Sequence, residues 1–448
     1  MRKLSAMLVS FVIYPAAAGA QPAPAPDDAL LVDLVQEALE RNPDIRAAQE
    51  MVEEARSRPA QVRALPDPTL SVSYLNEGLS PSLGSRDFTT LSFMWTQDLP
   101  YPGKRGLRGE MLSREADQAA QQLERARLST TAAVRRAYYG LVHARDRLAL
   151  IDEQERTFRQ IAAVARERYA VGQGVQQDVL RAQVEVTRIR QFRAEQEAEA
   201  SVRLAELNRL LDRASDTPLE TERHLELRPL GREPAELLVE AGAISPEVKS
   251  AALAVERDRV GVGLAQKAFK PDFSLQGGYQ NRGGIDGLWQ VGVGIRLPIY
   301  KKKNESGLAE AQARLRASER RSHAVKLLLR QRTQERFARI QAAEKTAELY
   351  ARGIVPQDRL SLEAALANYQ AGGVPFLTVL EALATLYGDR ETHLRLLATH
   401  EELRTSLAEA SLEAGPDGAM PDPARGGMGR GAMTSRVESQ ALAGSTNR

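Results

Sequence analysis

The fold of this chain is decided by residues 104–171, which read KRGLRGEMLSREADQAAQQLERARLSTTAAVRRAYYGLVHARDRLALIDEQERTFRQIAAVARERYAV. This stretch contains no proline and only three glycines. Read as one helix with a rise of about 1.5 Å per residue, it is roughly 100 Å long. From Leu112 to Ala137, small or apolar residues recur in alternating steps of four and three, which is typical of helices supercoiled side by side. The sequence therefore predicts a long rod that spans a distance.

The composition excludes several classes of function. Lys and Arg number 61 and Asp and Glu number 59, so the chain lacks the positive charge of a nucleic-acid-binding protein. It has no cysteine, which rules out disulfides, thiolate metal sites and thiol catalysis. Its five histidines form no HxxxH pair and no carboxylate cluster. With no catalytic or nucleotide-binding motif in view, we expect no enzyme activity, no cofactor and no resident metal ion.

The N-terminus has the pattern of a secretory signal. Arg2 and Lys3 precede an apolar run over 4–14, and small residues follow it. We predict a signal peptide over 1–20 and a Pro/Ala-rich linker over 21–28. A membrane-anchoring helix is the alternative, but the run is shorter than the roughly 20 residues that span a bilayer. We therefore expect an exported chain without a helical anchor.

Working outward from the long rod, the first half of the chain covers residues 29–212. An interrupted helix leads to residues 68–99, where two alternating segments joined by a Gly-, Ser- and Pro-rich loop predict a β-hairpin. Long helices over 104–212 follow, reversing once at a short glycine-bearing tip. Residues 213–232 carry Pro218, Pro229 and Gly231 and predict an irregular connector.

The second half, residues 233–414, repeats this order. A helix interrupted at Ser245-Pro246 precedes a hairpin over 272–299, whose turn we expect at 281–287. Long helices over 301–414 follow, with a break expected around 353–356, where Gly and Pro occur together.

Landmarks of the two halves recur at nearly one spacing, 198 to 205 positions. The pairs are Pro43 with Pro246, Pro66 with Pro271, Pro100 with Pro298, and Tyr169 with Tyr369. This regularity predicts an internal duplication. Residues 415–448, rich in Gly, Ala, Met and Arg, predict a disordered tail.

The four predicted strands each have one apolar face and one polar or small face. Their length of about ten residues is typical of outer-membrane barrel strands. Four strands cannot close a barrel, because about eight is the smallest number known, and lipid does not tolerate open sheet edges. Several chains would then have to share one barrel. A soluble antiparallel sheet with one wet face would show the same alternation, but the signal pattern, the long helices and the repeat favour the membrane.

Five stretches, taken in order, resemble the TolC-type outer-membrane factors of Gram-negative tripartite efflux systems. They are ALPDPTLSVSY (64–74), DLPYPGKRGLRGE (98–110), YAVGQGVQQDVLRAQ (169–183), LPIYKK (297–302) and GIVPQDRLSLEAALANYQAGGVPFLTVLEA (353–382). The likeness covers about residues 29–414. The LPDP, PGK and GIVP pieces are most similar to the heavy-metal efflux branch.

The resemblance implies a mainly α-helical fold with a small β part. Three copies of the chain, with four strands each, would complete a twelve-stranded outer-membrane β-barrel that continues into a long α-helical tube through the periplasm. The implied partners are a homotrimer, a periplasmic adaptor (membrane fusion) protein, an inner-membrane RND-type pump and outer-membrane lipid, with no nucleic acid. The implied localisation is the outer membrane, extending into the periplasm.

The two helix reversals are the sharpest functional candidates, because exposed backbone there is available to a partner. In the resembling family these tips meet the adaptor. The alternative, which does not exclude the first, is that the glycines only permit a tight turn. The tip residues are Val171, Gly172, Gln173, Gly174, Val175, Gly372, Gly373, Val374 and Pro375.

A pore gate is the second candidate, since the resembling family narrows the mouth with acidic residues just past the tips. Asp178 fits this pattern, whereas Thr378 stands where an aspartate is common and Glu381 keeps an acid one turn further on. A ring of acids around a symmetry axis would attract cations. Equally, these positions suit a solvated face or a carboxylate favoured by the helix dipole.

Basic residues cluster where strands lead into helices, and each half has one tryptophan in a strand. The cluster could meet anionic head groups, form part of a neck, or be an ordinary solvated face. The tryptophans could mark a membrane interface or fill a sheet face. These residues are Lys104, Arg105, Arg108, Lys301, Lys302, Lys303, Trp95 and Trp289.

Taken together, these patterns predict a passive trimeric export duct of a tripartite RND-type efflux system, for heavy-metal cations. Drug efflux or type I secretion through the same fold is one alternative. An exported, non-membrane coiled-coil scaffold is an alternative of another class.

Overall fold

The computed structural model describes residues 28–82, 88–221 and 223–412. The predicted signal peptide, the linker up to residue 27 and the predicted tail lie outside these residues. The first half consists of α1 (Ala29–Arg41), α2 (Pro43–Arg63), β1 (Thr69–Leu75), β2 (Thr90–Leu99), α3 (Lys104–Ala170) and α4 (Gln176–Leu210). The second half consists of α5 (Pro234–Ile244), α6 (Pro246–Lys267), β3 (Asp272–Arg282), β4 (Ile285–Arg296), α7 (Lys301–Leu349), η1 (Tyr350–Ile354), α8 (Val355–Gln370) and α9 (Phe376–Ala408).

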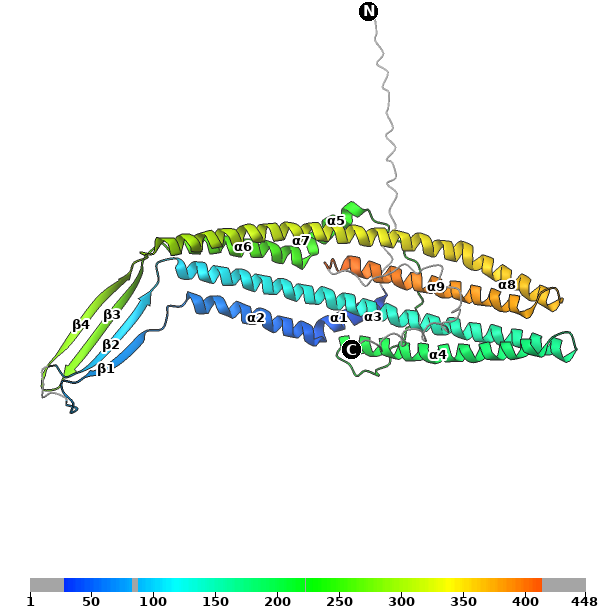
Figure 1. Ribbon diagram of the computed structural model, residues 1–448, viewed down its shortest axis with the longest axis horizontal. Helices are drawn as coiled ribbons and strands as arrows, with labels where there is room; N and C mark the ends of the chain where they lie inside the picture. Colours follow the sequence, from blue (N-terminus) through cyan, green and yellow to red (C-terminus); the bar gives the residue numbers. More distant parts are fainter. Residues whose placement is uncertain (1–27, 83–87, 222, 413–448) are drawn as a thin grey trace, which may run out of the picture.

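The long rod predicted from residues 104–171 is confirmed as α3, one unbroken helix of 67 residues. Ala116, Thr130 and Ala137 of the predicted seam are buried against neighbouring helices. Figure 1 shows the helices lying side by side as an elongated layer, with the sheet at one end. The prolines at 43 and 246 start α2 and α6, where their missing N–H groups need no partner.

Two of the rods in this layer are each assembled from two helices placed end to end. Helix α3 packs against α4 along one part of its length and against α2 along the other, and α7 does the same with α9 and α6. At the first joint, Asn42 caps α2 and donates a side-chain hydrogen bond to the carbonyl oxygen of Leu210 at 3.0 Å. Each half thus builds one continuous rod and one composite rod.

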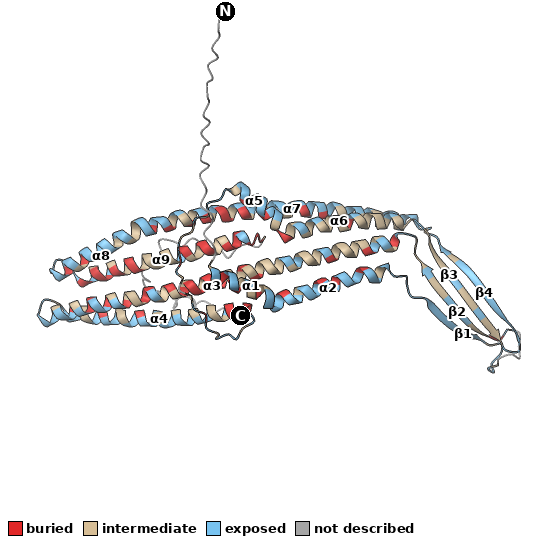
Figure 2. Cartoon of the chain, turned by 180° about the vertical axis from the view of Figure 1, so that it is seen from behind, coloured by how far each residue is buried: buried red, intermediate tan, exposed pale blue. Residues whose placement is uncertain are grey.

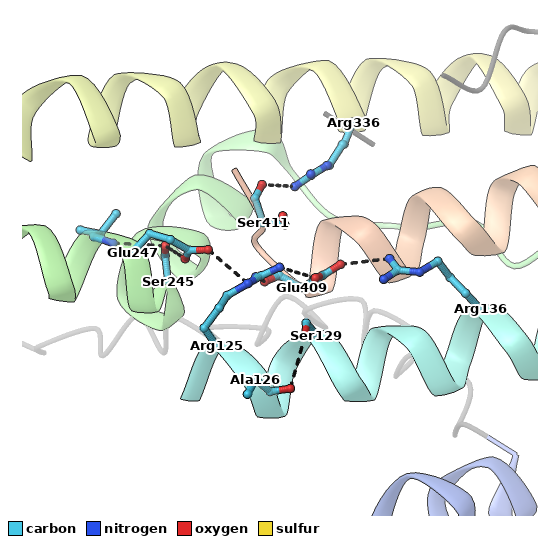
Figure 3. Close-up of polar contacts among 10 residues, drawn as sticks. Arg125, Ala126, Ser129, Arg136, Ser245, Glu247, Arg336, Glu409 and Ser411 are labelled. Atoms are coloured by element: carbon cyan, nitrogen blue, oxygen red, sulfur yellow. Dashed lines mark hydrogen bonds and ion pairs between the residues drawn. The ribbon is translucent and has the colours of Figure 1, made fainter. Parts of the chain in front are cut away.

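The second joint, between α9 and α6, is closed by charged side chains (Figure 3). The buried carboxylate of Glu409 pairs with Arg125 and with Arg136, at 3.0 Å, both from α3. Arg125 also pairs with Glu247 of α6 at 3.4 Å, and Arg336 of α7 donates to the carbonyl oxygen of Ser411 at 2.8 Å. The chain just past the end of α9 is therefore bound directly to α3 and α7, and through Arg125 to α6.

The four strands form one antiparallel sheet in the order β1-β2-β3-β4, so β2 and β3 join the two halves. The register aligns the apolar side chains of all four strands on one face, as in the row Val72–Phe93–Tyr279–Trp289. The predicted one-sided hairpins are confirmed. Among the described residues, neither β1 nor β4 has a second strand partner.

Two local predictions were wrong in detail. The turn between β3 and β4 is only Gly283-Gly284, not 281–287, because the ladder resumes with Arg282 opposite Ile285 after a register shift. Gly283 has φ of +70°, which suits so tight a turn. The break expected at 353–356 is instead a π turn: Val355 N–H donates to the carbonyl of Tyr350, so the helix widens and continues past Pro356.

The connector, residues 213–232, packs with α1 against one side of α3. Leu219 and Leu225 share a buried cluster with Leu31, Leu34 and Tyr138. Figure 2 shows buried residues concentrated along α3 and α9 and largely exposed residues along α4. No helix in the described part of the chain is both long enough and apolar enough to cross a membrane.

Candidate functional site: the two helical tips

Each tip is a tight reversal stabilised by the same backbone hydrogen bonds. In the first, Gly172 N–H donates to the carbonyl of Tyr169 at 3.1 Å and Gln173 N–H to that of Arg168 at 2.9 Å. In the second, Gly372 N–H donates to Tyr369 at 3.0 Å and Gly373 N–H to Asn368 at 2.8 Å.

The glycines at these reversals are required by the backbone. Gly172 has φ of +74° and Gly372 has φ of +80°, values that side-chain-bearing residues rarely adopt. Most of the nine predicted tip residues are exposed, and only Gly174 and Val374 are partly covered. The turn interpretation of the glycines is thus correct, and the backbone around them stays accessible to a partner.

The structure joins the two tips through Tyr369, at the end of α8. Its hydroxyl donates to Oδ2 of Asp178 in α4 at 3.3 Å. Its ring, 3% exposed, lies against the Phe376 ring with centroids 5.3 Å apart. The Arg168 guanidinium of α3 lies over the same ring, 4.5 Å from its centroid. Four helices thus meet at one tyrosine.

The electrostatics of this contact favour a protonated hydroxyl. Burial, and then the negative charge of Asp178, raise the pKa of Tyr369, against the opposing effect of Arg168. At neutral pH the phenol therefore keeps its proton and can donate a hydrogen bond to the carboxylate.

The three predicted gate residues occupy different environments. Asp178 is half-buried and holds Tyr369, so it belongs to the junction of the tips. Thr378 is half-buried, and its N–H donates to the carbonyl of Pro375 at 3.1 Å in the first turn of α9. Glu381 is exposed one turn further along α9. The contacts that join the tips include neither Thr378 nor Glu381.

Tyr369 and Arg168 were not predicted as site residues, and Tyr369 served only as a landmark of the repeat. They lie three and four residues before the tip glycines, in the last helical turn, from which a long side chain reaches the neighbouring tip. A long side chain in the last helical turn before a tip glycine is the sequence signal that could have identified both residues.

At the opposite end of the helices, the basic cluster divides into two kinds of residue. Lys104 is buried; it pairs with Asp272 of β3 at 2.8 Å and donates to the carbonyl of Lys270 at 3.1 Å. Lys104 therefore forms part of the neck that ties α3 to the sheet. Lys301, Lys302 and Lys303 are exposed.

The described residues contain no group of three or more His, Asp or Glu side chains that could hold a metal ion. Both tryptophans lie on the apolar sheet face, Trp95 38% and Trp289 79% exposed.

Comparison with known proteins identifies the family. The family model described as "Outer membrane efflux protein" matches residues 34–213 and 237–411, which together make up most of the chain and correspond to its two halves. The chain belongs to the outer membrane efflux protein family. Its place is accordingly the outer membrane, with an extension into the periplasm.

Two relatives carry names that refer to cation efflux or to resistance to metals. The chain is 25% identical to the cation efflux system protein CusC of Escherichia coli O157:H7 over 396 residues, covering 84% of each chain. It is 24% identical to the cobalt-zinc-cadmium resistance protein CzcC of Cupriavidus metallidurans over 306 residues, covering 68% of this chain and 73% of CzcC.

Solved structures show the same fold. A crystal structure of CusC matches with a TM-score of 0.71 and 21% identity, covering 86% of this chain and 92% of that one. The outer membrane protein VceC of Vibrio cholerae matches with a TM-score of 0.71 and 21% identity, covering 86% of this chain and 96% of VceC. The predicted fold class, a mainly helical TolC-like channel fold with a small antiparallel sheet, is thus confirmed.

Proposed function

We propose that three copies of this chain form a passive duct that exports heavy-metal cations across the periplasm and outer membrane, fed by an inner-membrane RND-type pump and a periplasmic adaptor. The observation that carries the duct is the sheet: its strands share one apolar face, yet within the described part of the chain neither edge strand has a partner on its outer side. Because lipid excludes open edges, β1 of one copy must pair with β4 of the next. Four strands per copy then complete a twelve-stranded barrel.

The helices support the same assembly. Helices α4 and α8 lie at opposite flanks of the layer, α4 against α3 and α8 against α9. Both helices expose large apolar residues in the single chain, among them Leu180, Val184 and Phe192 of α4 and Leu360 of α8. Contact between these flanks in neighbouring copies would cover exposed apolar surface and continue the barrel as a tube.

The cargo is inferred from the relatives, since CusC and CzcC are named for cation efflux and for cobalt, zinc and cadmium resistance. We infer no energy-coupling role for this chain, so the pump supplies the driving force.

The exposed tips, residues 171–175 and 372–375, are the proposed contacts for the adaptor. We place the gate beside them: the Tyr369–Asp178 hydrogen bond holds the tips together, and opening moves the tip helices. Thr378 and Glu381 are proposed to line the mouth past this bond.

The assembly is tested by extracting the protein from outer membranes in mild detergent and measuring its mass. A trimer is expected, and a water-soluble monomer would support the scaffold alternative. Cysteine pairs that cross-link the tips of neighbouring copies are expected to stop export, with reduction restoring it. Unimpaired export through cross-linked tips would exclude gating by tip movement.

The cargo is tested by deleting the gene and measuring growth with zinc, cobalt, cadmium, copper or silver salts, and separately with drugs. Sensitivity to metals alone is expected. Sensitivity to drugs alone would favour the drug-efflux alternative, and loss of a secreted polypeptide would favour type I secretion.

A further inference from the structure

We propose that Arg168 is the positioning residue that couples the two tips, holding the Tyr369 ring so that its hydroxyl meets Asp178. This inference rests on the proposed function, in which movement of the tips opens the duct. It assigns the coupling to one side chain of α3 that belongs to the first tip and acts on the second.

The Arg168 side chain touches both tips at once. Its Nη2 donates to the carbonyl oxygen of Gln173, in the first tip, at 3.1 Å. Its guanidinium lies 4.5 Å from the centroid of the Tyr369 ring. A Cβ atom placed on Gly372, in the second tip, would lie 3.4 Å from the same Nη2. The guanidinium thus fills the space between the first tip, the tyrosine and the second tip.

The internal repeat shows that this side chain is not needed to form a tip. Asn368 holds the position equivalent to Arg168, 200 residues later, and the carbonyls of both residues accept the same turn hydrogen bond. Because the same backbone hydrogen bonds form both turns, the first turn does not depend on the guanidinium of Arg168. The two tyrosines differ as well: Tyr369 is 3% exposed beneath Arg168, whereas Tyr169 is 47% exposed. The arginine–tyrosine contact therefore joins Arg168 of α3 to Tyr369 of α8, and the equivalent pair, Asn368 and Tyr169, does not repeat it.

The contact is suited to release. A cation over an aromatic ring is a weak contact, strong enough to bias the position of the ring without fixing it permanently. The Nε atom of Arg168 is buried without a hydrogen-bond partner, a cost that is relieved when the side chain moves into water. A partner that displaces the Gln173 carbonyl would therefore withdraw Arg168 from the ring.

The consequence is that the tips cannot open independently. Without the guanidinium above it, the Tyr369 side chain is held less firmly against Phe376, and its hydroxyl can shift away from Asp178. An adaptor that binds only the first tip would thereby also release the second. Through Arg168, binding of a partner at the first tip would loosen the second tip as well.

The test uses the purified, full-length trimer in planar lipid bilayers and measures mean conductance. Arg168→Ala is expected to raise conductance to the level reached by Tyr369→Phe. The double variant is expected to rise no further, because both changes break one linkage. Arg168→Lys, which keeps the charge but loses the planar group, is expected to lie between wild type and Arg168→Ala. Asn368→Ala and Tyr169→Phe, the matched positions of the other tip, are expected to match wild type.

Trimer content and thermal midpoint are measured for each variant, and Arg168→Gln replaces Arg168→Ala if the latter does not assemble. Conductance of the Arg168 variant at the wild-type level, with Tyr369→Phe raised, would overturn the coupling while leaving the gate intact. An additive rise in the double variant would also overturn it. Unchanged conductance in Tyr369→Phe itself would instead count against the gate in the proposed function.

Discussion

The side-chain amide of Asn42 donates a hydrogen bond to the carbonyl oxygen of Leu210, 168 positions away, at 3.0 Å. The same side chain accepts from the N–H groups of Asp44 and Ile45, at 2.9 and 3.4 Å. One buried asparagine therefore supplies hydrogen-bond partners both to the N–H groups at the start of α2 and to a carbonyl oxygen at the end of α4. These are the helix ends whose backbone groups lack partners within their own helices.

Replacing Asn42 by alanine is expected to destabilise the composite rod. Loss of the cap costs about 1 kcal/mol, and a buried carbonyl without a donor costs about 1–3 kcal/mol more. Asn42→Ser, which copies Ser245 of the second half, keeps the cap but is too short to reach Leu210, so an intermediate loss is expected. Thermal unfolding in detergent, followed by circular dichroism, measures the loss of stability in each of the two variants. Equal midpoints for the two variants would show that the Leu210 bond contributes nothing.

Removing the carboxylate of Glu409 is expected to open the other composite rod (Figure 3). In Glu409→Gln, Arg125 and Arg136 lose their shared partner at a site where the glutamate side chain is only 6% exposed. We expect a loss of about 2–3 kcal/mol, below the roughly 3–5 kcal/mol of a fully buried pair because the arginines keep some water contact. Urea unfolding in detergent measures it.

The matched control is Glu310→Gln, which breaks the exposed Glu310–Arg314 pair of α7. Surface pairs contribute little, so a change within about 0.5 kcal/mol is expected. Similar losses in the two variants would mean that the Glu409 cluster does not hold α9 in place.

The sequence was sufficient for features that depend on neighbouring residues. The absence of proline predicted α3, alternation predicted the strands, and prolines at 43 and 246 predicted the interruptions. Asp178 was named as a gate candidate because the resembling family carries acidic residues just past its tips. Each of these signals lies within a few residues of the feature that it predicts.

Contacts between distant segments could not be predicted in this way. Tyr369 and Asp178 lie 191 positions apart, and Lys104 and Asp272 lie 168 apart. Only the packing of the helix hairpins and the closing of the sheet bring them together. The π turn was missed for another reason: Gly353 and Pro356 indicate that the helix is disturbed, but the pattern does not distinguish a widened turn from a break.

The stability of the α8–α9 hairpin is expected to depend on pH through Asp358. Burial, together with a hydrogen bond to Asp389 and its charge, raises the pKa of Asp358 from 3.8 to about 6. The folded protein therefore keeps a proton that the unfolded chain has released between these values, so stability falls as pH rises from about 4 to about 6. Asp358→Asn is expected to flatten this decline and to raise the thermal midpoint above pH 6.

Thermal midpoints at pH 4.5 and 7.5 measure the effect. Glu363→Gln, in the same helix but exposed and paired with Arg359, is the control and should keep the wild-type slope. An equal slope in wild type and Asp358→Asn would exclude a shared proton between the two aspartates.

The apolar sheet face is tested at two adjacent residues of β4. Val291 lies on the face shared with Trp95 and is 69% exposed in the isolated chain, whereas Gln290 lies on the opposite face beside Met94. If lipid covers the apolar face, Val291→Lys places a charge in hydrocarbon, at about 2–4 kcal/mol near the bilayer midplane. Gln290→Lys would point into the water-filled interior and should assemble normally. The amount of detergent-extracted trimer in outer-membrane fractions measures this difference. Equal yields from the two variants would mean that the apolar face does not meet lipid, and the barrel shared between copies would have to be abandoned.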